Sequence, residues 1–281
     1  MHNNFHTSNP ASAGRMMEGV RFQNWSMKKL YIQALDTIAD AFTVLARKAG
    51  RPVRVPMGDG YVYRYREKSI YQAIVLKLAR SITGLQAVST LNNAGLLQEQ
   101  AALQRTLDEF HEDVVFLCFG IIFRDMTDLH AAYLDAFWEE EFDDPNSATE
   151  STQKRPMVSR KKIRAYTSKD RGTGYDQSTT IEIGRTISKT YSGYVHGASP
   201  QLMERYYGEP PRFHLAGGTD SPFFEDHSDD LLNYYYRTIL SFGFAAKAFG
   251  EEELFEKIRN YSSSFAIASG REERLREKAE I

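Results

Sequence analysis

The sequence contains a single cysteine, Cys118, among its 281 residues. One cysteine excludes a disulfide within the chain, so the fold must be stabilised by the burial of apolar side chains. Cys118 lies in the apolar run VVFLCFGIIF, where we interpret it as a small buried hydrophobic residue rather than as a nucleophile. The lack of a disulfide framework fits a reducing environment, and we expect a cytoplasmic protein.

Long apolar runs are also lacking. The run around Cys118 is the longest one, and it is too short to span a bilayer, which takes about 20 apolar residues. The first residues, MHNNFHTSNPASAG, contain neither the basic segment nor the apolar segment of a signal peptide. We therefore expect a soluble chain without a membrane partner.

Neither sign of charge is in excess. The 35 Lys and Arg residues against 37 Asp and Glu residues give a formal net charge of −2. A contact with nucleic acid or anionic lipid would therefore need a local basic patch. The sequence also has no phosphate-binding glycine loop, no zinc-ligand set and no nucleophile elbow, and we expect no cofactor and no bound metal. The acidic residues 225–230 predict a helix start, because adjacent side chains cannot all converge on one ion.

The strongest pattern in the sequence is a helical one over residues 96–123. Apolar residues recur there four and three positions apart, at Leu103, Leu107, Phe110, Val114, Leu117 and Ile121. The opposite face changes along its length from charged to aromatic, with Arg105, Glu109, Glu112, Phe116, Phe119 and Phe123. A helix that is apolar all round must be covered on both sides. We therefore predict that this is the central helix of the fold.

The same periodicity predicts further helices. The first begins near Asn24 or Ser26, and the second is capped by Ser69 and runs to about residue 93. Gly95 leaves so short a joint that the second helix and the central helix must form an antiparallel hairpin. The remaining helices are expected at residues 127–142, at 179–196, from 225–230 onward, and around 254–265. A short β-hairpin is expected near residues 53–65.

These elements predict an all-α, antiparallel bundle of about seven helices in one domain, residues 25–269. Residues 1–24 are expected to form a disordered or loosely attached tail, and residues 270–281 a charged tail. The polar residues 143–178 are interpreted as a long loop carrying one short helix, with a domain boundary as the alternative. The basic residues 160–164 within it could contact phosphates, but a solvated loop is the default interpretation.

Two groups of polar residues are candidates for a site. Arg105 and Glu109 lie one turn apart on the central helix, either as a half-buried structural ion pair or as part of a catalytic site. The second group is a polar helix face formed by Arg185, Lys189, Ser192 and His196, next to Tyr191. It is either a solvated face or a substrate-binding strip. His196 would end that helix, where the dipole favours an imidazolium that can donate a proton.

The segments RTLDEF (residues 105–110) and TYSGYVHG (residues 190–197) resemble poorly characterised bacterial all-helical families near the HEPN superfamily (higher eukaryotes and prokaryotes nucleotide-binding). The resemblance covers roughly residues 69–197. It implies a helical bundle, often dimeric, with roles in toxin–antitoxin or anti-phage defence modules. It also implies metal-independent ribonuclease activity in some members.

The chain departs from the pattern of the active HEPN ribonucleases, which carry Arg and His four to six residues apart on one helix. Two pairs match this spacing literally, Arg124 with His130 and Arg105 with His111. Arg124 and His130 are the better candidates, because Asp125 supplies the polar residue that follows the arginine. However, a predicted helix break at Thr127 separates them, and Arg105 and His111 fall on different faces of their helix.

Two functions from different classes follow. The first is a HEPN-like protein of a bacterial defence or toxin-type module that acts on RNA or a nucleotide through His196, Arg105 and Glu109, as a homodimer in the manner of that superfamily. The alternative is a non-catalytic helical interaction protein, in which these residues stabilise the bundle and aromatic faces bind a protein partner. A third function is the binding of a small molecule in a pocket lined by tyrosines.

Overall fold

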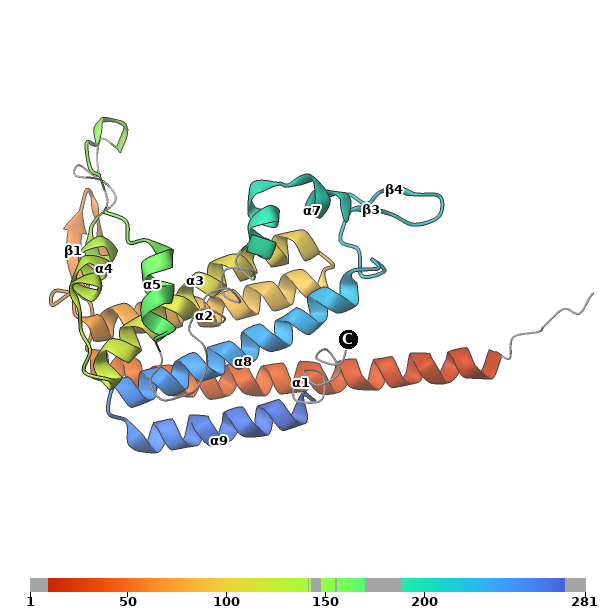
Figure 1. Ribbon diagram of the computed structural model, residues 1–281, viewed down its shortest axis with the longest axis horizontal. Coiled ribbons are helices and arrows are strands. Elements are labelled where there is room, and N and C mark those ends of the chain that lie inside the picture. The colour runs from red at the N-terminus through yellow and green to blue at the C-terminus, as the bar shows by residue number, and fades with distance from the viewer. Residues whose placement is uncertain (1–9, 141, 143–147, 155, 170–188, 271–281) are drawn as a thin grey trace, which may run out of the picture.

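A computed structural model describes residues 10–140, 142, 148–154, 156–169 and 189–270, with side chains from residue 27 onward. The chain forms a bundle of long helices with two small antiparallel hairpins (Figure 1), which confirms the predicted all-α class. The helices are α1 (Pro10–Ala49), α2 (Ile70–Asn93), α3 (Leu97–Ile122), α4 (Asp128–Trp138), a 3-10 turn η1 (Ala148–Glu150), α5 (Arg160–Thr167), α7 (Ser199–Met203), α8 (Phe224–Ala248) and α9 (Glu252–Ala268). The strands are β1 (Val53–Met57), β2 (Gly60–Arg64), β3 (Tyr206–Tyr207) and β4 (Arg212–Phe213), and residues 189–196 are also helical.

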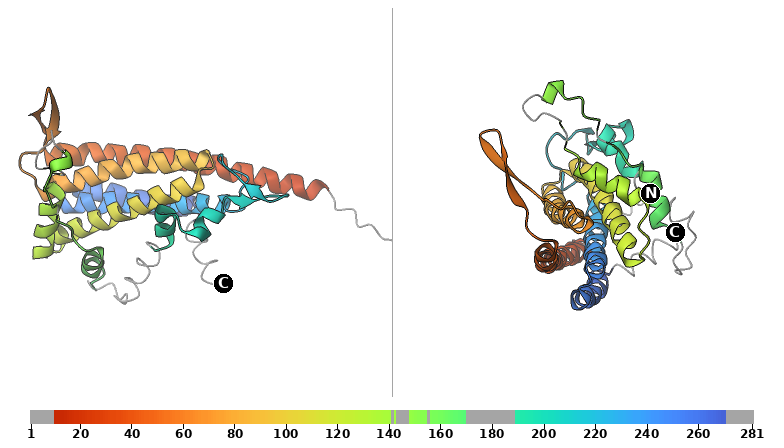
Figure 2. Two further views of the ribbon diagram at one scale, coloured as in Figure 1. Left: turned by 90° about the horizontal axis from the view of Figure 1, so that it is seen from above. Right: turned by 90° about the vertical axis from the view of Figure 1, so that its left-hand side faces the viewer.

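The long helices α1, α2, α3, α8 and α9 run side by side (Figure 2). The β1–β2 hairpin, α4 and α5 lie at one end of the bundle, and α7 with the β3–β4 hairpin lies toward the other end (Figure 1). None of the helices in the described ranges combines the length and the apolar character needed to cross a membrane.

The predicted α2–α3 hairpin is present and is defined by local signals. Ser69 caps α2 through a capping box, in which its hydroxyl accepts from the Gln72 amide and the Gln72 side chain accepts from Ser69. Gly95 joins the two helices with φ of +67°, a conformation that favours glycine. A Cβ atom at Gly95 would also lie 2.5 Å from the backbone nitrogen of Gly218. Glycine is therefore required at this joint for two reasons.

Helix α3 is the central helix, as predicted, and packs against α2, α5 and α8. Leu107, Val114 and Leu117 on its apolar stripe are fully buried. Phe116 on the opposite face is buried as well, because α4 and α5 cover it through Tyr133 and Tyr166. The apolar second half of α3 is thus covered on both sides.

The prediction for the first helix is wrong at its start. Helix α1 begins at Pro10, well before Asn24 and Ser26, so most of the expected tail is helical backbone. Residues 1–9 lie outside the described part of the chain. Met27 is the first residue with a described side chain, and it already packs against the core. A helix segment that no neighbouring helix covers needs no apolar stripe. The apolar periodicity of the sequence therefore does not locate the first residue of such a segment.

In the second half of the chain the predicted helices are present where the structure describes them, and α7 and the β3–β4 hairpin are additional elements that were not predicted. Helix α5 is the one short helix expected within residues 143–178, and it packs on α3 through Ile163 and Tyr166. Helices α8 and α9 agree with the expected positions. The first part of the helix expected at 179–196, up to residue 188, and the end of the C-terminal tail, from residue 271, lie outside the described residues.

Candidate functional site

The Arg105–Glu109 pair forms as predicted, with 2.8 Å between Arg105 Nη2 and Glu109 Oε1. The Arg105 side chain is 18% exposed and the Glu109 side chain 36%. A third residue, Arg160 of α5, places its Nη2 3.5 Å from the second Glu109 oxygen. The pair therefore belongs to a larger charged network on the α5 side of the central helix.

That network extends along α3 and joins three helices. The carboxylate of Asp113 is fully buried and accepts from Lys77 of α2 at 2.7 Å and from Arg160 at 2.5 Å. Glu112 accepts from Arg164 at 2.7 Å. Burial raises the pKa of Glu112, and the hydrogen bond and charge of Arg164 oppose this. Arg160 and Arg164 of α5 are thus anchored on acidic residues of α3, whereas Lys161 and Lys162 are exposed. This corrects the default interpretation of residues 160–164 as a solvated loop.

His130 occupies a structural position. Its side chain is fully buried, its Nδ1 accepts from the Thr127 backbone amide at 3.2 Å, and its Nε2 lies 3.2 Å from the Phe116 carbonyl oxygen. These contacts require the neutral tautomer with the proton on Nε2. His130 takes the place of the Glu or Gln of a capping box at the start of α4. A sealed imidazole with both nitrogens engaged is poorly placed to reach a substrate.

Arg124 and His130 are not presented on one surface. Arg124 follows Phe123, the C-cap of α3, and has the left-handed conformation with φ of +52°. Its side chain is exposed, whereas His130 is buried. The helix break predicted at Thr127 is present, because Thr127 is the N-cap of α4. The two residues of the better HEPN-like pair therefore lie on opposite sides of a helix joint.

The second candidate strip is described from residue 189 onward, and Arg185 lies outside the described residues. Lys189 and His196 are exposed, and Ser192 is half-buried. Tyr191 is buried, and its hydroxyl donates to Asp230 of α8. Burial, followed by the influence of Tyr234 and Asp230, raises the pKa of Tyr191 above its usual value. Tyr191 therefore holds this helix on α8, and among the described contacts none joins His196 to Arg105 or Glu109.

A buried polar seam between α3 and α8 was not predicted. Its α3 members are Gln100, Gln104, Asp108 and His111, and its α8 members are His227, Tyr234, Arg237, Thr238 and Ser241. The members on α3 follow spacings of four, four and three, and most of those on α8 spacings of seven, four and three. Those spacings are the signal in the sequence, because they place each polar set on one helical stripe.

The contacts within the seam are specific. Asp108 accepts from Arg237 Nη1 at 2.5 Å, and the His111 Nδ1 lies 3.0 Å from the Ser241 hydroxyl. Burial, followed by the charge of Arg237, holds the pKa of His111 well below its usual value, so His111 is neutral at pH 7. Both amide atoms of Gln104 are buried without a hydrogen-bond partner. Asp108 and His111 are buried, whereas the Arg237 side chain is 32% exposed. The buried histidine is poorly suited to acid–base exchange with a substrate.

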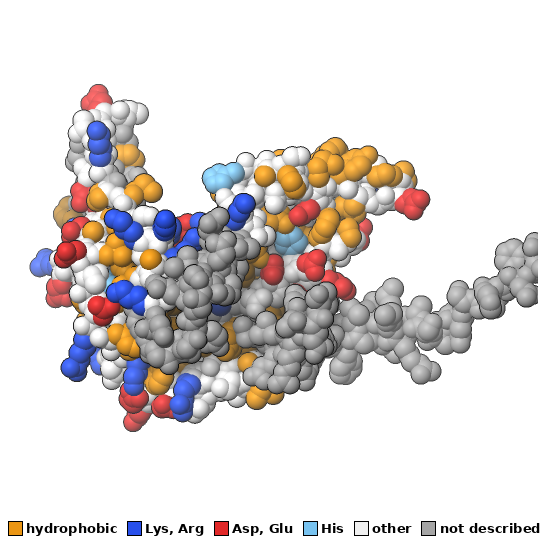
Figure 3. All heavy atoms as spheres, viewed as in Figure 1, with side chains coloured by type: hydrophobic (Ala, Val, Ile, Leu, Met, Phe, Trp, Pro, Cys, Tyr) orange, Lys and Arg blue, Asp and Glu red, His pale blue; other side chains and the backbone are white. Residues whose placement is uncertain are grey.

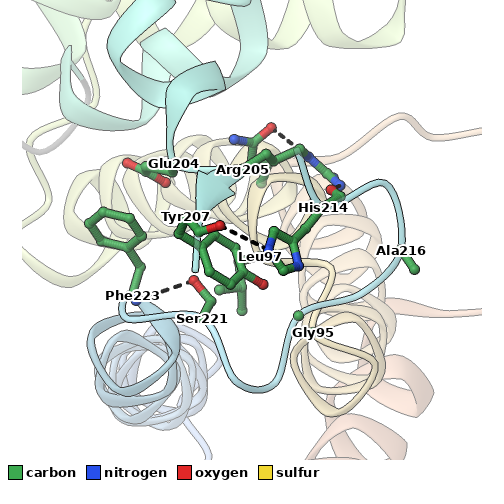
Figure 4. Close-up of a pocket in the computed structure, with 11 residues that line it drawn as sticks. Gly95, Leu97, Glu204, Arg205, Tyr207, His214, Ala216, Ser221 and Phe223 are labelled. Atoms are coloured by element: carbon green, nitrogen blue, oxygen red, sulfur yellow. Dashed lines mark hydrogen bonds between the residues drawn. The ribbon is translucent and has the colours of Figure 1, made fainter. Parts of the chain in front are cut away.

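The segment from α7 to β4 is fixed on the α2–α3 turn. Arg205 binds both Glu99 oxygens through Nη2, at 2.6 and 2.8 Å. His214 stacks on Tyr207 with 3.7 Å between ring centroids, and its Nε2 lies 3.1 Å from the Tyr207 carbonyl oxygen (Figure 4). A cavity of about 20 Å³ lies among these side chains, enough for about one water molecule.

Residues 195–215, which include this segment and its immediate flanks, expose apolar side chains, and we call these side chains the apolar arm. Its members are Val195, Leu202, Met203, Tyr206, Phe213 and Leu215. Leu215 is 90% exposed and Phe213 58%. Hydrophobic atoms gather on this projecting part of the molecule in the space-filling view (Figure 3). The sequence predicts no helix between residues 196 and 225, and its pattern did not single out this segment.

Comparisons with protein-family models, with curated proteins and with solved structures found no match. Within the described residues, no group of three or more His, Cys, Asp or Glu side chains is placed to hold a metal ion. The predicted residues therefore separate into a bonded ion-pair network, a capping histidine and an exposed strip, rather than a single cleft.

Proposed function

We propose that this protein is a non-catalytic helical interaction protein that binds a protein partner through the apolar arm. The observation that carries the proposal is the exposure of Phe213 and Leu215 on a segment that is otherwise tightly held by Arg205 and His214. Exposed apolar side chains gathered on one part of a surface are typical of protein–protein contacts. A rigidly held apolar surface favours the binding of a protein partner over the catalysis of a reaction.

The proposal assigns the polar candidates to the stability of the bundle. Glu109 is bonded to both Arg105 and Arg160, and His130 caps α4. The partner that we propose first is a second copy of this chain. The net charge of −2 supports self-association, because it gives little repulsion between two copies.

The test is sedimentation velocity of the full chain over a range of concentrations. We expect the wild type to self-associate at micromolar concentration and the double variant Phe213→Ser, Leu215→Ser to remain monomeric with an unchanged circular dichroism spectrum. The matched control is Ile267→Ser, because Ile267 is an apolar residue on α9 whose exposure of 75% lies between those of Phe213 and Leu215. This control should associate like the wild type. A wild type that stays monomeric throughout would exclude a second copy as the partner.

A second candidate is HEPN-like action on RNA or a nucleotide in a bacterial defence or toxin-type module. It is favoured by the exposure of His196 at the end of its helix, with Lys189 exposed on the same helix. Incubation of labelled RNA with the protein in a metal chelator tests it. Cleavage that is lost in His196→Ala but kept in a folded His130 variant would establish a ribonuclease. Intact RNA with all proteins folded would exclude this activity.

A further inference from the structure

A cavity of about 350 Å³ lies between β2, the loop that precedes α2, and the C-terminal end of α4. Its size falls within the range of about 300–1,000 Å³ typical of small-molecule sites. It lies at the end of the bundle away from the apolar arm (Figure 1), so it is separate from the surface that carries the proposed function. Its walls combine aromatic rings from Tyr63, Tyr65, Phe137 and Trp138 with a few charged side chains.

The aromatic walls are set at right angles to one another. The Trp138 ring meets Tyr65 edge to face at 76°, with 6.3 Å between centroids, and meets Phe137 at 78° and 4.8 Å. Tyr63 of β2 also lines the cavity and is 54% exposed. Rings arranged in this way favour a planar guest, which can stack on one ring and meet the edge of another.

The charged groups of the cavity differ in their free hydrogen-bonding capacity. Arg64 uses Nε and Nη2 on Glu140, at 2.7 and 3.0 Å, and Nη1 on the Tyr63 carbonyl oxygen at 3.0 Å. Glu140 therefore has both oxygens engaged. The Lys68 ammonium donates to the Trp138 carbonyl oxygen at 3.3 Å. An ammonium carries three protons, so Lys68 can also donate to an anionic group of a ligand.

Lys68 is also held in an unusual backbone conformation. Its φ of +51° lies in the left-handed region, which residues other than glycine rarely adopt. Such conformations concentrate at binding sites, where the surrounding structure holds a side chain in place. The conformation places the lysine between β2 and the end of α4, where its ammonium reaches the Trp138 carbonyl.

We propose that this cavity binds a small planar aromatic ligand that carries an anionic group. The ring packs against Trp138 and Tyr63, and the anion accepts from the Lys68 ammonium. An aromatic ammonium is disfavoured at the same position, because it would face Lys68. The two carboxylates that line the cavity already have partners, since Glu140 is bonded to Arg64 and Glu139 accepts from the Gln153 side chain. A non-aromatic anion lacks the contacts with the rings.

Isothermal titration calorimetry of the full chain with three probes of similar size tests each part of the proposal. Indole-3-acetate supplies both the ring and the anion, tryptamine reverses the charge, and cyclohexaneacetate removes the aromatic ring. We expect indole-3-acetate to bind at least tenfold more tightly than either of the others. Equal or tighter binding of tryptamine or cyclohexaneacetate, or no binding of indole-3-acetate at millimolar concentration, would overturn the proposal.

Two variants then assign the binding to these residues. Lys68→Gly removes the ammonium and suits the positive φ, so the fold should be retained, and we expect indole-3-acetate to bind at least tenfold more weakly. Tyr63→Ala removes an exposed aromatic ring from the wall of the cavity and should weaken the binding of indole-3-acetate by a similar factor. Lys257→Ala is the control, because Lys257 is an exposed lysine on α9. Unchanged binding by Lys68→Gly, with the same melting temperature as the wild type, would reject the assignment.

Discussion

The imidazole of His130 lies flat against the ring of Phe116, with 4.0 Å between the ring centroids and 7° between the planes. The same imidazole bonds to the carbonyl oxygen of Phe116. One side chain thereby connects the start of α4 to the middle of the central helix. A histidine that resembles half of an Arg–His catalytic pair in the sequence is a packing and capping residue in the fold.

His130→Ala should destabilise the protein strongly, because it removes the ring stack on Phe116, the capping hydrogen bond with Thr127 and the buried hydrogen bond to the Phe116 carbonyl. We expect a loss of about 2–4 kcal/mol in the free energy of unfolding. Urea denaturation followed by circular dichroism measures it. His196→Ala is the matched control, since His196 is exposed, and should change the stability by less than about 0.5 kcal/mol. Equal stability of the two variants would contradict the capping role.

Arg124→Gly should stabilise the protein. Arg124 has a φ of +52° where α3 ends, and glycine adopts this conformation without a steric penalty. We expect a gain of about 0.5–1 kcal/mol, after the greater unfolded-state entropy of glycine is subtracted. Thermal unfolding measures the gain, with Arg124→Ala as the control that keeps the strain. A lower melting temperature for the glycine variant would show that the arginine side chain makes a stabilising contact.

Asp113→Asn should be one of the most damaging single substitutions in the chain. It leaves Lys77 and Arg160 without the buried carboxylate that both contact. We expect a loss of about 3–5 kcal/mol, with faster amide exchange in α5. Glu252→Gln, in the exposed pair with Lys247, should cost less than about 1 kcal/mol. If both variants unfold at the same urea concentration, the network does not anchor α5.

The lowered pKa of His111 predicts that the free energy of unfolding depends on pH. Its pKa in the folded protein is well below 6.5, the value expected in the unfolded chain. As the pH falls below about 6.5, the unfolded chain takes up a proton that the folded protein does not. Stability should therefore fall by about 1.4 kcal/mol per pH unit below 6.5, until the folded pKa is reached.

Urea denaturation at several pH values between 7.5 and 5 measures this slope. His111→Gln keeps a side chain that can bond to Ser241 and Thr238 but does not titrate, so the slope should become shallower by that amount. An unchanged slope in the variant would assign the pH dependence to other groups.

The sequence predicted the elements that depend on local signals. Ser69 and Thr127 begin helices where expected, Gly95 makes the antiparallel joint, and the apolar stripe of α3 is buried. Each of these features is determined within one or two helical turns. Helix α1 is the exception, because its backbone continues beyond the last turn that the bundle covers.

The features that were missed depend on pairs of distant segments. Arg160 is charged and lies in a polar stretch, and only the fold shows that Glu109 and Asp113 lie beneath it. Asp108 likewise has a partner, Arg237, that is 129 positions away. A polar residue on a helix can be solvated or buried against another polar residue. Whether the residue is solvated or buried depends on the neighbouring helix, and the local sequence pattern carries no information about that helix.

The close approach of two backbones also bears on how the apolar arm would bind. Gly218 donates its amide to the Gly95 carbonyl at 3.0 Å, and a Cβ atom on Gly217 would overlap the Ala94 carbonyl oxygen. The turn between α2 and α3 therefore determines the direction in which the arm projects. The conformational entropy of the arm is already lost when the chain folds. The binding of a partner would therefore have little additional entropic cost from ordering the arm. Its affinity would then depend on the fit of the partner and on the integrity of the bundle beneath.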